Sequence, residues 1–240
     1  MLTGRTAVIT GASRGIGAAT ARALAAAGVR VALVARSAGA LHALAAELNA
    51  EFGDGHLVAP ADCTDAIDVA ALAAAVMQWA HGAPDILVNN AGIYPRTLLV
   101  EQDAEEFAKT LDLNLVAPFR VLRAFLPAMR QRGSGHVVSI GTVADRNIWP
   151  MNSAYSASKY GLRALHEVLY AESRGSGVRA TLIAPGAVDT DLWEPHEAEL
   201  GKTLSKREAM LRPDDVARAV LYAVSQPAHV TVHELRLSPS

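Results

Sequence analysis

Short apolar runs alternate with longer helical stretches along most of the chain, and this order restricts the fold more than any other feature. The runs are rich in Val, Ile and Leu and seldom alternate with polar residues, which is typical of strands buried on both faces of a parallel sheet. We expect strands at Ala7–Thr10, Arg30–Ala35, His56–Ala59, Ile86–Asn89, Gly135–Ile140, Arg179–Ala184 and Val230–Leu235.

The segments between these runs have the Ala- and Leu-rich composition of helices. We expect helices at Ile16–Ala27, Ala38–Glu51, Ala66–Gly82, Asp103–Arg132, Met151–Arg174 and Pro213–Ser225. The repeated strand–helix–strand order predicts a doubly wound α/β fold of the Rossmann type, in which helices cover both faces of a mostly parallel seven-stranded sheet in three layers. A length of 240 residues suits a single domain over residues 1–240, because nothing between the strands resembles a linker.

One long irregular stretch, Asp191–Arg212, interrupts this order. It follows an expected strand and mixes charged residues with Trp193 and Pro195. Long connections without regular structure in compact domains often cover a ligand site. We therefore expect residues 191–212 to form a mobile flap over the substrate site.

Composition and charge bear on location and partners. A net charge of −2 gives no electrostatic reason to expect nucleic acid or an anionic membrane as a partner. The one cysteine, Cys63, cannot form an intrachain disulfide, and no apolar run reaches the ~18 residues of a membrane span. The N-terminus lacks the basic region of a signal peptide, so we expect a cytoplasmic protein.

No metal site is expected from the eight histidines. Their spacing does not match that of zinc ligands. His229 and His233 are four positions apart in an expected strand, which separates them by roughly 13 Å.

The first expected strand leads into the first helix through Thr10-Gly11-Ala12-Ser13-Arg14-Gly15-Ile16-Gly17. Glycines at such a turn let backbone N–H groups approach a pyrophosphate, and the helix N-terminus adds partial positive charge. The spacing is not the common G-x-G-x-x-G, so a glycine-rich turn that binds nothing is the alternative on this motif alone.

Further motifs follow in a fixed order. They are Asn89-Asn90-Ala91-Gly92, Asn114 within a helix, Tyr155-Ser156-Ala157-Ser158-Lys159, and Pro185-Gly186-Ala187-Val188-Asp189-Thr190. Together with the glycine loop, they resemble the short-chain dehydrogenase/reductases of the compact single-domain type, over nearly the whole chain. The resemblance implies one domain that binds a nicotinamide dinucleotide and a small carbonyl or alcohol substrate.

The resemblance and the charges near the loop together indicate which residues contact the cofactor. The expected contacts are Gly11, Ser13, Arg14, Gly15, Ile16, Gly17, Arg36, Asp62, Asn89, Ala91, Gly92, Tyr155, Lys159, Pro185, Gly186, Val188 and Thr190. By resemblance, Asp62 contacts the adenine amino group; a cap at the end of a strand is the alternative role for this side chain.

The end of the second strand discriminates between NAD and NADP. Relatives that bind NAD carry an acidic residue there, which bonds the ribose hydroxyls. This chain has Ala35 at that position, followed by Arg36, and Arg14 lies in the glycine loop. Two guanidinium groups are suited to a 2′-phosphate, so we expect NADP(H). If both arginines are only solvated surface charges, NAD is the alternative.

Tyr155 and Lys159 are four residues apart in an expected helix, so they share one face. Hydride transfer to a carbonyl requires a proton donor, and the reverse reaction requires a base. A free tyrosine has a pKa of ~10, which a neighbouring cation lowers. We expect Tyr155 to be the general acid and base. By resemblance, Lys159 also contacts the nicotinamide ribose.

A hydroxyl residue usually stands thirteen positions before this tyrosine in the family, as a serine. Here that position is Thr142, which keeps the hydroxyl and adds a methyl group that narrows the pocket. We expect Thr142 to be catalytic, and Ser139 is the other candidate. Asn114 resembles the family's catalytic asparagine, which supports a proton relay; it can also kink a long helix near Pro118.

Residues that follow strand ends are candidates for the substrate pocket or for ordinary loops. They are Tyr94, Arg96, Asp145, Arg146, Trp149 and Trp193. The long helices Asp103–Arg132 and Met151–Arg174 resemble those that pair subunits in this family, so a homotetramer or homodimer is expected. The alternative functions are an epimerase or dehydratase, and a cofactor sensor without turnover.

Overall fold

The computed structural model describes residues 2–202 and 204–240, and in them seven parallel strands form one sheet in the order β3-β2-β1-β4-β5-β6-β7. The strands are β1 Thr6–Thr10, β2 Arg30–Ala35, β3 Leu57–Pro60, β4 Ile86–Asn89, β5 Gly135–Ile140, β6 Val178–Pro185 and β7 Glu234–Leu237. The order reverses between β1 and β4, and in doubly wound sheets ligands bind outside the carboxyl ends of the strands at this point. The predicted fold is confirmed.

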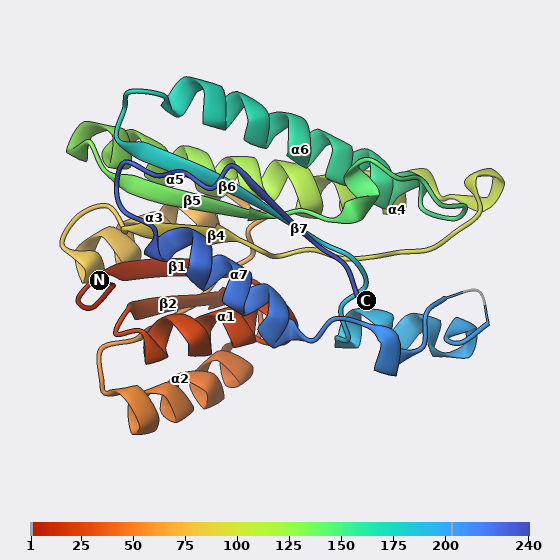
Figure 1. Ribbon diagram of the computed structural model, residues 1–240, viewed down its shortest axis with the longest axis horizontal. Helices are drawn as coiled ribbons and strands as arrows, with labels where there is room; N and C mark the ends of the chain where they lie inside the picture. The colour runs from red at the N-terminus through yellow and green to blue at the C-terminus, as the bar shows by residue number, and fades with distance from the viewer. Residues whose placement is uncertain (1, 203) are drawn as a thin grey trace.

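Helices cover both faces of the sheet (Figure 1). One layer contains α1 Gly15–Ala26, α2 Ala38–Phe52 and α7 Pro213–Ser225; the other contains α3 Ala66–Ala80, α4 Ala104–Leu111, α5 Ala117–Arg132 and α6 Ser153–Ser173. Successive strand residues belong to different layers, since Ile9 packs in the core with α1 and Val8 in the core with α5. The sheet is therefore buried on both faces, as its continuous apolar runs predict.

The prediction of one helix over Asp103–Arg132 is wrong in detail. A π-helical turn, Asp112–Val116, separates α4 from α5. Pro118 follows in the first turn of α5, where the missing N–H costs no intrahelical bond. The widened turn contains Asn114, whose side chain is completely buried.

The last strand begins later than predicted, at Glu234 rather than Val230. Two side chains of β6 donate hydrogen bonds to backbone carbonyl groups of Val230 and Val232, which a strand would use to pair with its neighbour. Arg179 Nη1 donates to Val230 O at 3.0 Å, and Thr181 Oγ1 donates to Val232 O at 2.6 Å. His233 consequently precedes the strand, where its ring stacks on that of Tyr170.

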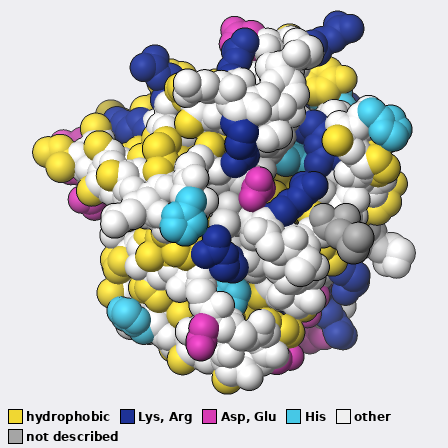
Figure 2. Space-filling view, turned by 90° about the vertical axis from the view of Figure 1, so that its left-hand side faces the viewer, with side chains coloured by type: hydrophobic (Ala, Val, Ile, Leu, Met, Phe, Trp, Pro, Cys, Tyr) yellow, Lys and Arg dark blue, Asp and Glu magenta, His cyan; other side chains and the backbone are white. Residues whose placement is uncertain are grey.

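Figure 2 looks onto the side of the molecule that Figure 1 shows at the left, near the N-terminus, where basic, acidic and apolar side chains are mixed. Within residues 2–202 and 204–240, no helix is both long and apolar enough to cross a membrane, and no three His, Cys, Asp or Glu side chains are grouped to hold a metal ion.

Candidate active site

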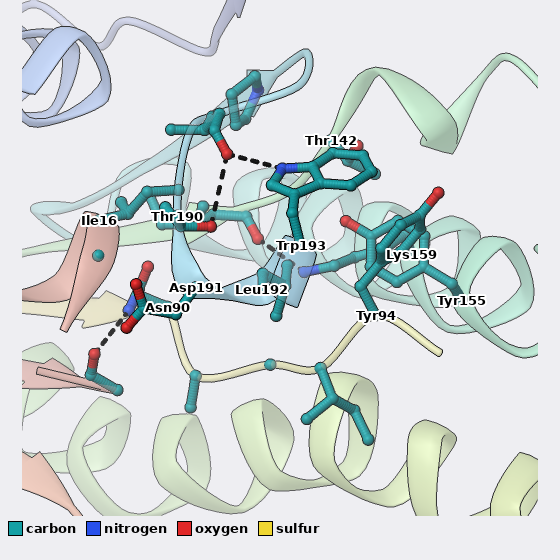
Figure 3. A pocket seen from close by; sticks show the side chains of 18 of the residues that line it. Ile16, Asn90, Tyr94, Thr142, Tyr155, Lys159, Thr190, Asp191, Leu192 and Trp193 are labelled. Atoms are coloured by element: carbon teal, nitrogen blue, oxygen red, sulfur yellow. Dashed lines mark hydrogen bonds between the residues drawn. The ribbon is translucent and has the colours of Figure 1, made fainter. Parts of the chain in front are cut away.

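A cavity of about 1100 Å³ lies at the carboxyl ends of the strands. It extends from the glycine loop between β1 and α1 to Tyr155 of α6 and past it to Tyr94 and Trp193. Figure 3 shows its two ends, with Ile16 and Asn90 at one and Tyr155 and Lys159 at the other. The cavity therefore occupies the place that the strand order indicates for a ligand.

The glycine loop follows a path that requires its glycines. Gly11 and Gly15 have φ angles of +67° and +55°, in the left-handed region that side chains disfavour. A Cβ on Gly17 would lie 2.1 Å from Gly11 O, and a Cβ on Gly11 would lie 2.9 Å from Ala91 Cα. Asn90 Nδ2 fixes the loop by donating to Thr10 O at 2.9 Å and Gly11 O at 3.2 Å.

Most of the residues expected to contact the cofactor line this cavity. They are Gly11, Ser13, Arg14, Gly15, Ile16, Arg36, Asp62, Ala91, Gly92, Tyr155, Lys159, Pro185, Gly186, Val188 and Thr190. Gly17 and Asn89 are not among the lining residues, and their contact with the cofactor stays a prediction. Gly17 packs behind the loop against Gly11 O, and Asn89 Nδ2 donates to Pro118 O at 3.4 Å. Asn90 lies in the motif Asn89-Asn90-Ala91-Gly92 but is not among the expected contacts. The structure places it in the lining of the cavity.

The cavity wall after β2 and β3 carries Ala35, Arg36 and Asp62. Asp62 Oδ1 accepts hydrogen bonds from Thr64 N at 2.9 Å and Thr64 Oγ1 at 2.7 Å. These bonds, and the charge of Arg36, hold the pKa of the Asp62 carboxyl below its usual value. Asp62 therefore caps the turn after β3 and also faces the cavity. Arg14 is exposed and lies 3.4 Å from Asp191 of the flap.

Tyr155 and Lys159 are in the first turns of α6, on one face of the helix, as predicted. Lys159 is buried; its Nζ lies 5.8 Å from the centre of the Tyr155 ring and donates to Ile140 O at 3.1 Å. Burial lowers the pKa of Lys159 to about 8 and raises the pKa of Tyr155 to about 12. The phenol therefore carries its proton at neutral pH.

Thr142 lines the cavity directly after β5, and the interaction of its side chain with that of Tyr155 lowers the pKa of Tyr155 against the larger effect of burial. Thr142 Oγ1 also accepts from Ala144 N at 3.2 Å. Ser139 points away from the cavity, where its hydroxyl lies 3.1 Å from His166 Nδ1. Between the two candidate hydroxyls, the geometry favours Thr142.

Asn114 links the π-helical turn to the loop after β4. Its Oδ1 accepts from Ile93 N and its Nδ2 donates to Ile93 O, both at 2.9 Å. Nδ2 also donates to Ser158 Oγ at 3.1 Å, next to Lys159. A Cβ on Gly92 would lie 3.1 Å from Asn114 Oδ1 and 3.9 Å from Lys159 Nζ. Asn114 therefore fixes the backbone around the buried lysine.

Beyond Tyr155 the cavity is lined by Tyr94, Arg96, Trp149 and Trp193, four of the residues expected there. The Tyr94 ring meets the rings of Tyr155 and Trp193 edge-on, with centroid distances of 4.6 and 5.2 Å. Figure 3 shows these rings grouped beside Lys159.

Asp145 and Arg146 are not among the residues that line the cavity, which favours the other expectation, that they are ordinary loop residues. Asp145 is only 1% exposed and pairs with Arg163 at 3.1 Å and Arg236 at 3.0 Å. Arg146 pairs with Glu234. These residues instead connect the loop after β5 to α6 and β7.

Comparison with known proteins agrees with this geometry. The family model described as short chain dehydrogenase matches residues 5–201. The chain belongs to the short-chain dehydrogenase family. An uncharacterized oxidoreductase of Staphylococcus haemolyticus is 37% identical over 238 residues, 99% of this chain and 98% of the relative. As a member of this family, the protein is an oxidoreductase.

Two solved structures of short-chain dehydrogenase fold are similar to it. An alcohol dehydrogenase from the archaeon Thermococcus sibiricus, complexed with 5-hydroxy-NADP, has a TM-score of 0.87 and 34% identity, covering 98% of this chain and 96% of its own. A metagenomic short-chain oxidoreductase in complex with NADP has a TM-score of 0.85 and 34% identity, covering 100% and 98%.

Short-chain dehydrogenases use a nicotinamide cofactor, and the residues of this chain fit such a group. Gly11 and Gly15 line the cavity at the N-terminus of α1, where a pyrophosphate would be stabilised. The cavity continues past Ala35 and Arg36 at one side and past Pro185 and Gly186 at the other. It then passes Tyr155 and reaches the aromatic side chains of Tyr94 and Trp193, so one elongated cofactor and a substrate can share it.

Proposed function

We propose that the protein is an NADP(H)-dependent oxidoreductase that transfers a hydride between the nicotinamide and a carbonyl compound or secondary alcohol. The observation that carries the proposal is the position of the Tyr155 hydroxyl. It lies beside Thr142 and Lys159, between the part of the cavity that begins at the glycine loop and the part lined by aromatic side chains.

In this mechanism the bound nicotinamide supplies the hydride for reduction or accepts it in oxidation. Tyr155 donates its phenolic proton to the substrate oxygen during reduction and takes a proton from the alcohol during oxidation. With its pKa raised to about 12 by burial, the phenol is protonated at pH 7, so the resting side chain is ready to act as an acid. Thr142 is placed to donate a hydrogen bond to the same oxygen.

Lys159 supports the phenolate that forms when Tyr155 gives up its proton. Its ammonium lies next to the ring, and a cation at this distance stabilises the negative form. Burial lowers the pKa of Lys159 to about 8, so most of the population keeps its charge at pH 7. Asn114 acts through the backbone around Lys159, and we propose that it completes the proton relay with water.

The preference for NADP(H) rests on the charges around Ala35. Arg36 follows the end of β2 and is exposed, and Arg14 lies at the start of α1. An acidic side chain, which would repel a 2′-phosphate, does not stand at position 35. The two related structures in complex with NADP forms support this assignment.

Two experiments test the proposal. Purified protein with NADPH is assayed for absorbance loss at 340 nm against a panel of ketones and aldehydes, and turnover of at least one carbonyl is expected. Binding of NADPH with no consumption in the presence of any of these substrates would favour a cofactor sensor instead.

The variant Ala35→Asp with Arg36→Ala is expected to shift kcat/KM towards NADH. An unchanged ratio of kcat/KM for NADPH to kcat/KM for NADH would contradict the NADP assignment.

The flap and the subunit arrangement belong to the same proposal. Residues 191–212 include the 3₁₀ segment Asp191–Glu199, and His196 Nε2 lies 3.0 Å from Tyr94 O. We propose that this segment covers the substrate. We also propose that the chain is a single domain and that it acts in the cytoplasm.

Apolar side chains exposed on α5 and α6, Phe119 and Tyr160, support the expected homodimer or homotetramer, which sizing chromatography tests.

A further inference from the structure

The end of the cavity beyond Tyr155 has a mainly apolar wall. Its large side chains are Tyr94, Trp149, Met151, Leu192, Trp193 and Leu204. Tyr94 stands directly against the catalytic ring, so a substituent on the reacting carbonyl meets aromatic surface at once. Burying an apolar or aryl group against such a wall is favourable.

An ion pair between Arg96 and Glu199 interrupts this apolar wall. Both residues line the cavity, and Arg96 Nη1 lies 2.6 Å from Glu199 Oε2. The Arg96 side chain is only 7% exposed, against 32% for Glu199. Arg96 comes from the loop after β4 and Glu199 from the flap, so the pair joins the two walls of the substrate site.

The two partners differ in their other contacts. Arg96 Nη2 contacts Met151 Sδ at 3.8 Å, and Nε has no hydrogen-bond partner within the described residues. Glu199 Oε1 lies 3.7 Å from His196 Nδ1. The buried guanidinium thus keeps one N–H without a partner among the described residues, while its charge is balanced by the flap carboxylate.

We propose that Glu199 determines the charge of the accepted substrate: by occupying Arg96, it makes the site select uncharged carbonyl compounds with an apolar or aryl substituent and reject those that carry a carboxylate. The inference rests on the proposed function and names its substrate class. Arg96 is the anion-binding group of the pocket, and the protein's own carboxylate already fills that position.

Electrostatics explains the exclusion. A substrate carboxylate that enters this wall loses its hydration and meets Glu199, a like charge, beside the guanidinium. Lys159 is a second cation near the catalytic ring, and its Nζ is already bonded to Ile140 O. An uncharged substrate avoids both costs and leaves the ion pair intact.

Matched substrates test the proposal because each pair differs in one charge. The pairs are ethyl benzoylformate with benzoylformate, and methyl 4-acetylbenzoate with 4-acetylbenzoate, so the charge lies near to the carbonyl or far from it. The measured quantity is kcat/KM for the acid divided by that for the ester. We expect wild-type protein to prefer both esters by at least about tenfold.

The variant Glu199→Gln keeps the shape of the side chain and removes its charge. We expect it to raise the acid-to-ester ratio by about tenfold or more, because Arg96 can then pair with the substrate carboxylate. In the double variant Arg96→Met with Glu199→Gln this gain should disappear. Glu197→Gln is the matched control, since Glu197 lies on the same flap segment, is exposed and does not line the cavity.

The results separate this inference from the proposed function. No turnover of either ester or acid with NADPH would count against the function itself. A wild-type preference for the acids would overturn the inference and show that Arg96 binds them by exchange with Glu199. Turnover with an unchanged ratio in Glu199→Gln would also overturn it, provided that the melting temperature and NADPH affinity show a folded variant.

Discussion

The two ends of the cavity are built in different ways. The cofactor end consists largely of backbone, where Gly11 and Gly15 follow a left-handed path and Asn90 ties the loop to β4. The substrate end consists of side chains from separate segments, among them Tyr94 after β4, Trp149 after β5 and Trp193 in the flap. The cofactor end therefore depends on close packing of the backbone, and the substrate end depends on the identity of its side chains.

This difference shows which part of the protein can vary. Any side chain at Gly17 would collide with Gly11 O, so the cofactor end tolerates little substitution without movement of the loop. Exchanges at the substrate end leave β1, α1 and their contacts in place. We therefore expect changes at the substrate end to alter turnover, and changes at the cofactor end to alter NADPH affinity.

The largest effect is expected for Tyr155→Phe. The variant removes the proton donor and keeps the ring that packs against Tyr94. Positioned acid–base groups contribute about 10²–10⁴-fold to rates, so kcat/KM for a neutral ketone should fall by roughly 10³-fold. NADPH affinity, measured by fluorescence quenching, should stay within about threefold of wild type. Turnover near the wild-type rate would remove Tyr155 from the mechanism.

A smaller loss of turnover is expected for Thr142→Val. Valine has nearly the same shape but cannot bond the Tyr155 hydroxyl or the substrate oxygen. Loss of one such donor costs about 10²–10³-fold in kcat. Thr142→Ser is the control, because it restores the hydroxyl and should recover most of the rate. If Thr142→Val is as active as wild type, the role of Thr142 is structural.

Gly17→Ala tests the other end of the cavity. Its new Cβ would lie 2.1 Å from Gly11 O and 2.7 Å from Asn90 Nδ2, so the loop must move. Forced insertions of this kind cost about 1–3 kcal/mol, and we expect a 10- to 100-fold rise in the Kd for NADPH together with a lower melting temperature. Gly39→Ala in α2 is the matched control, since its Cβ has no atom within 4 Å. Equal affinities in the two variants would contradict the packing argument.

The smallest effect is a shift of the pH profile in Asp145→Asn. The buried Asp145 carboxylate raises the pKa of both Tyr155 and Lys159. Without its charge, Tyr155 gives up its proton at lower pH, and the rise of alcohol oxidation with pH should move to lower pH. A rate profile from pH 6 to 11 measures the shift, with Glu167→Gln as control, because Glu167 also pairs with Arg163 but is half-exposed. A shift to higher pH would contradict the account.

Much of the cofactor end could be predicted from the sequence because its residues lie in short continuous motifs. The glycine loop, Ala91 to Gly92 and the pair Tyr155 and Lys159 each need only local spacing to be found. Asn90 lies in the same motif as Asn89, and its Nδ2 bonds to Thr10 O and Gly11 O identify it as the residue that faces the loop.

The remaining features depend on contacts between distant parts of the chain. The π-helical turn at Asn114 accompanies bonds to Ile93, twenty-one residues earlier. The late start of β7 depends on Arg179 and Thr181 in the neighbouring strand. Asp145 follows Thr142 closely in sequence, yet its pairs with Arg163 and Arg236 turn it away from the cavity. Local patterns carry no signal for such pairs.

Isotope transfer tests most directly whether a hydride moves from the cofactor end to the substrate end of one cavity. Protein is incubated with NADPH deuterated at either face of nicotinamide C4 and an uncharged aryl ketone, and the alcohol is analysed by mass spectrometry. The account predicts that the label from one face, and not from the other, appears on the carbinol carbon, and that Tyr155→Phe suppresses its rate of appearance. Alcohol without deuterium from either face, or label transfer at an equal rate in Tyr155→Phe, would contradict it.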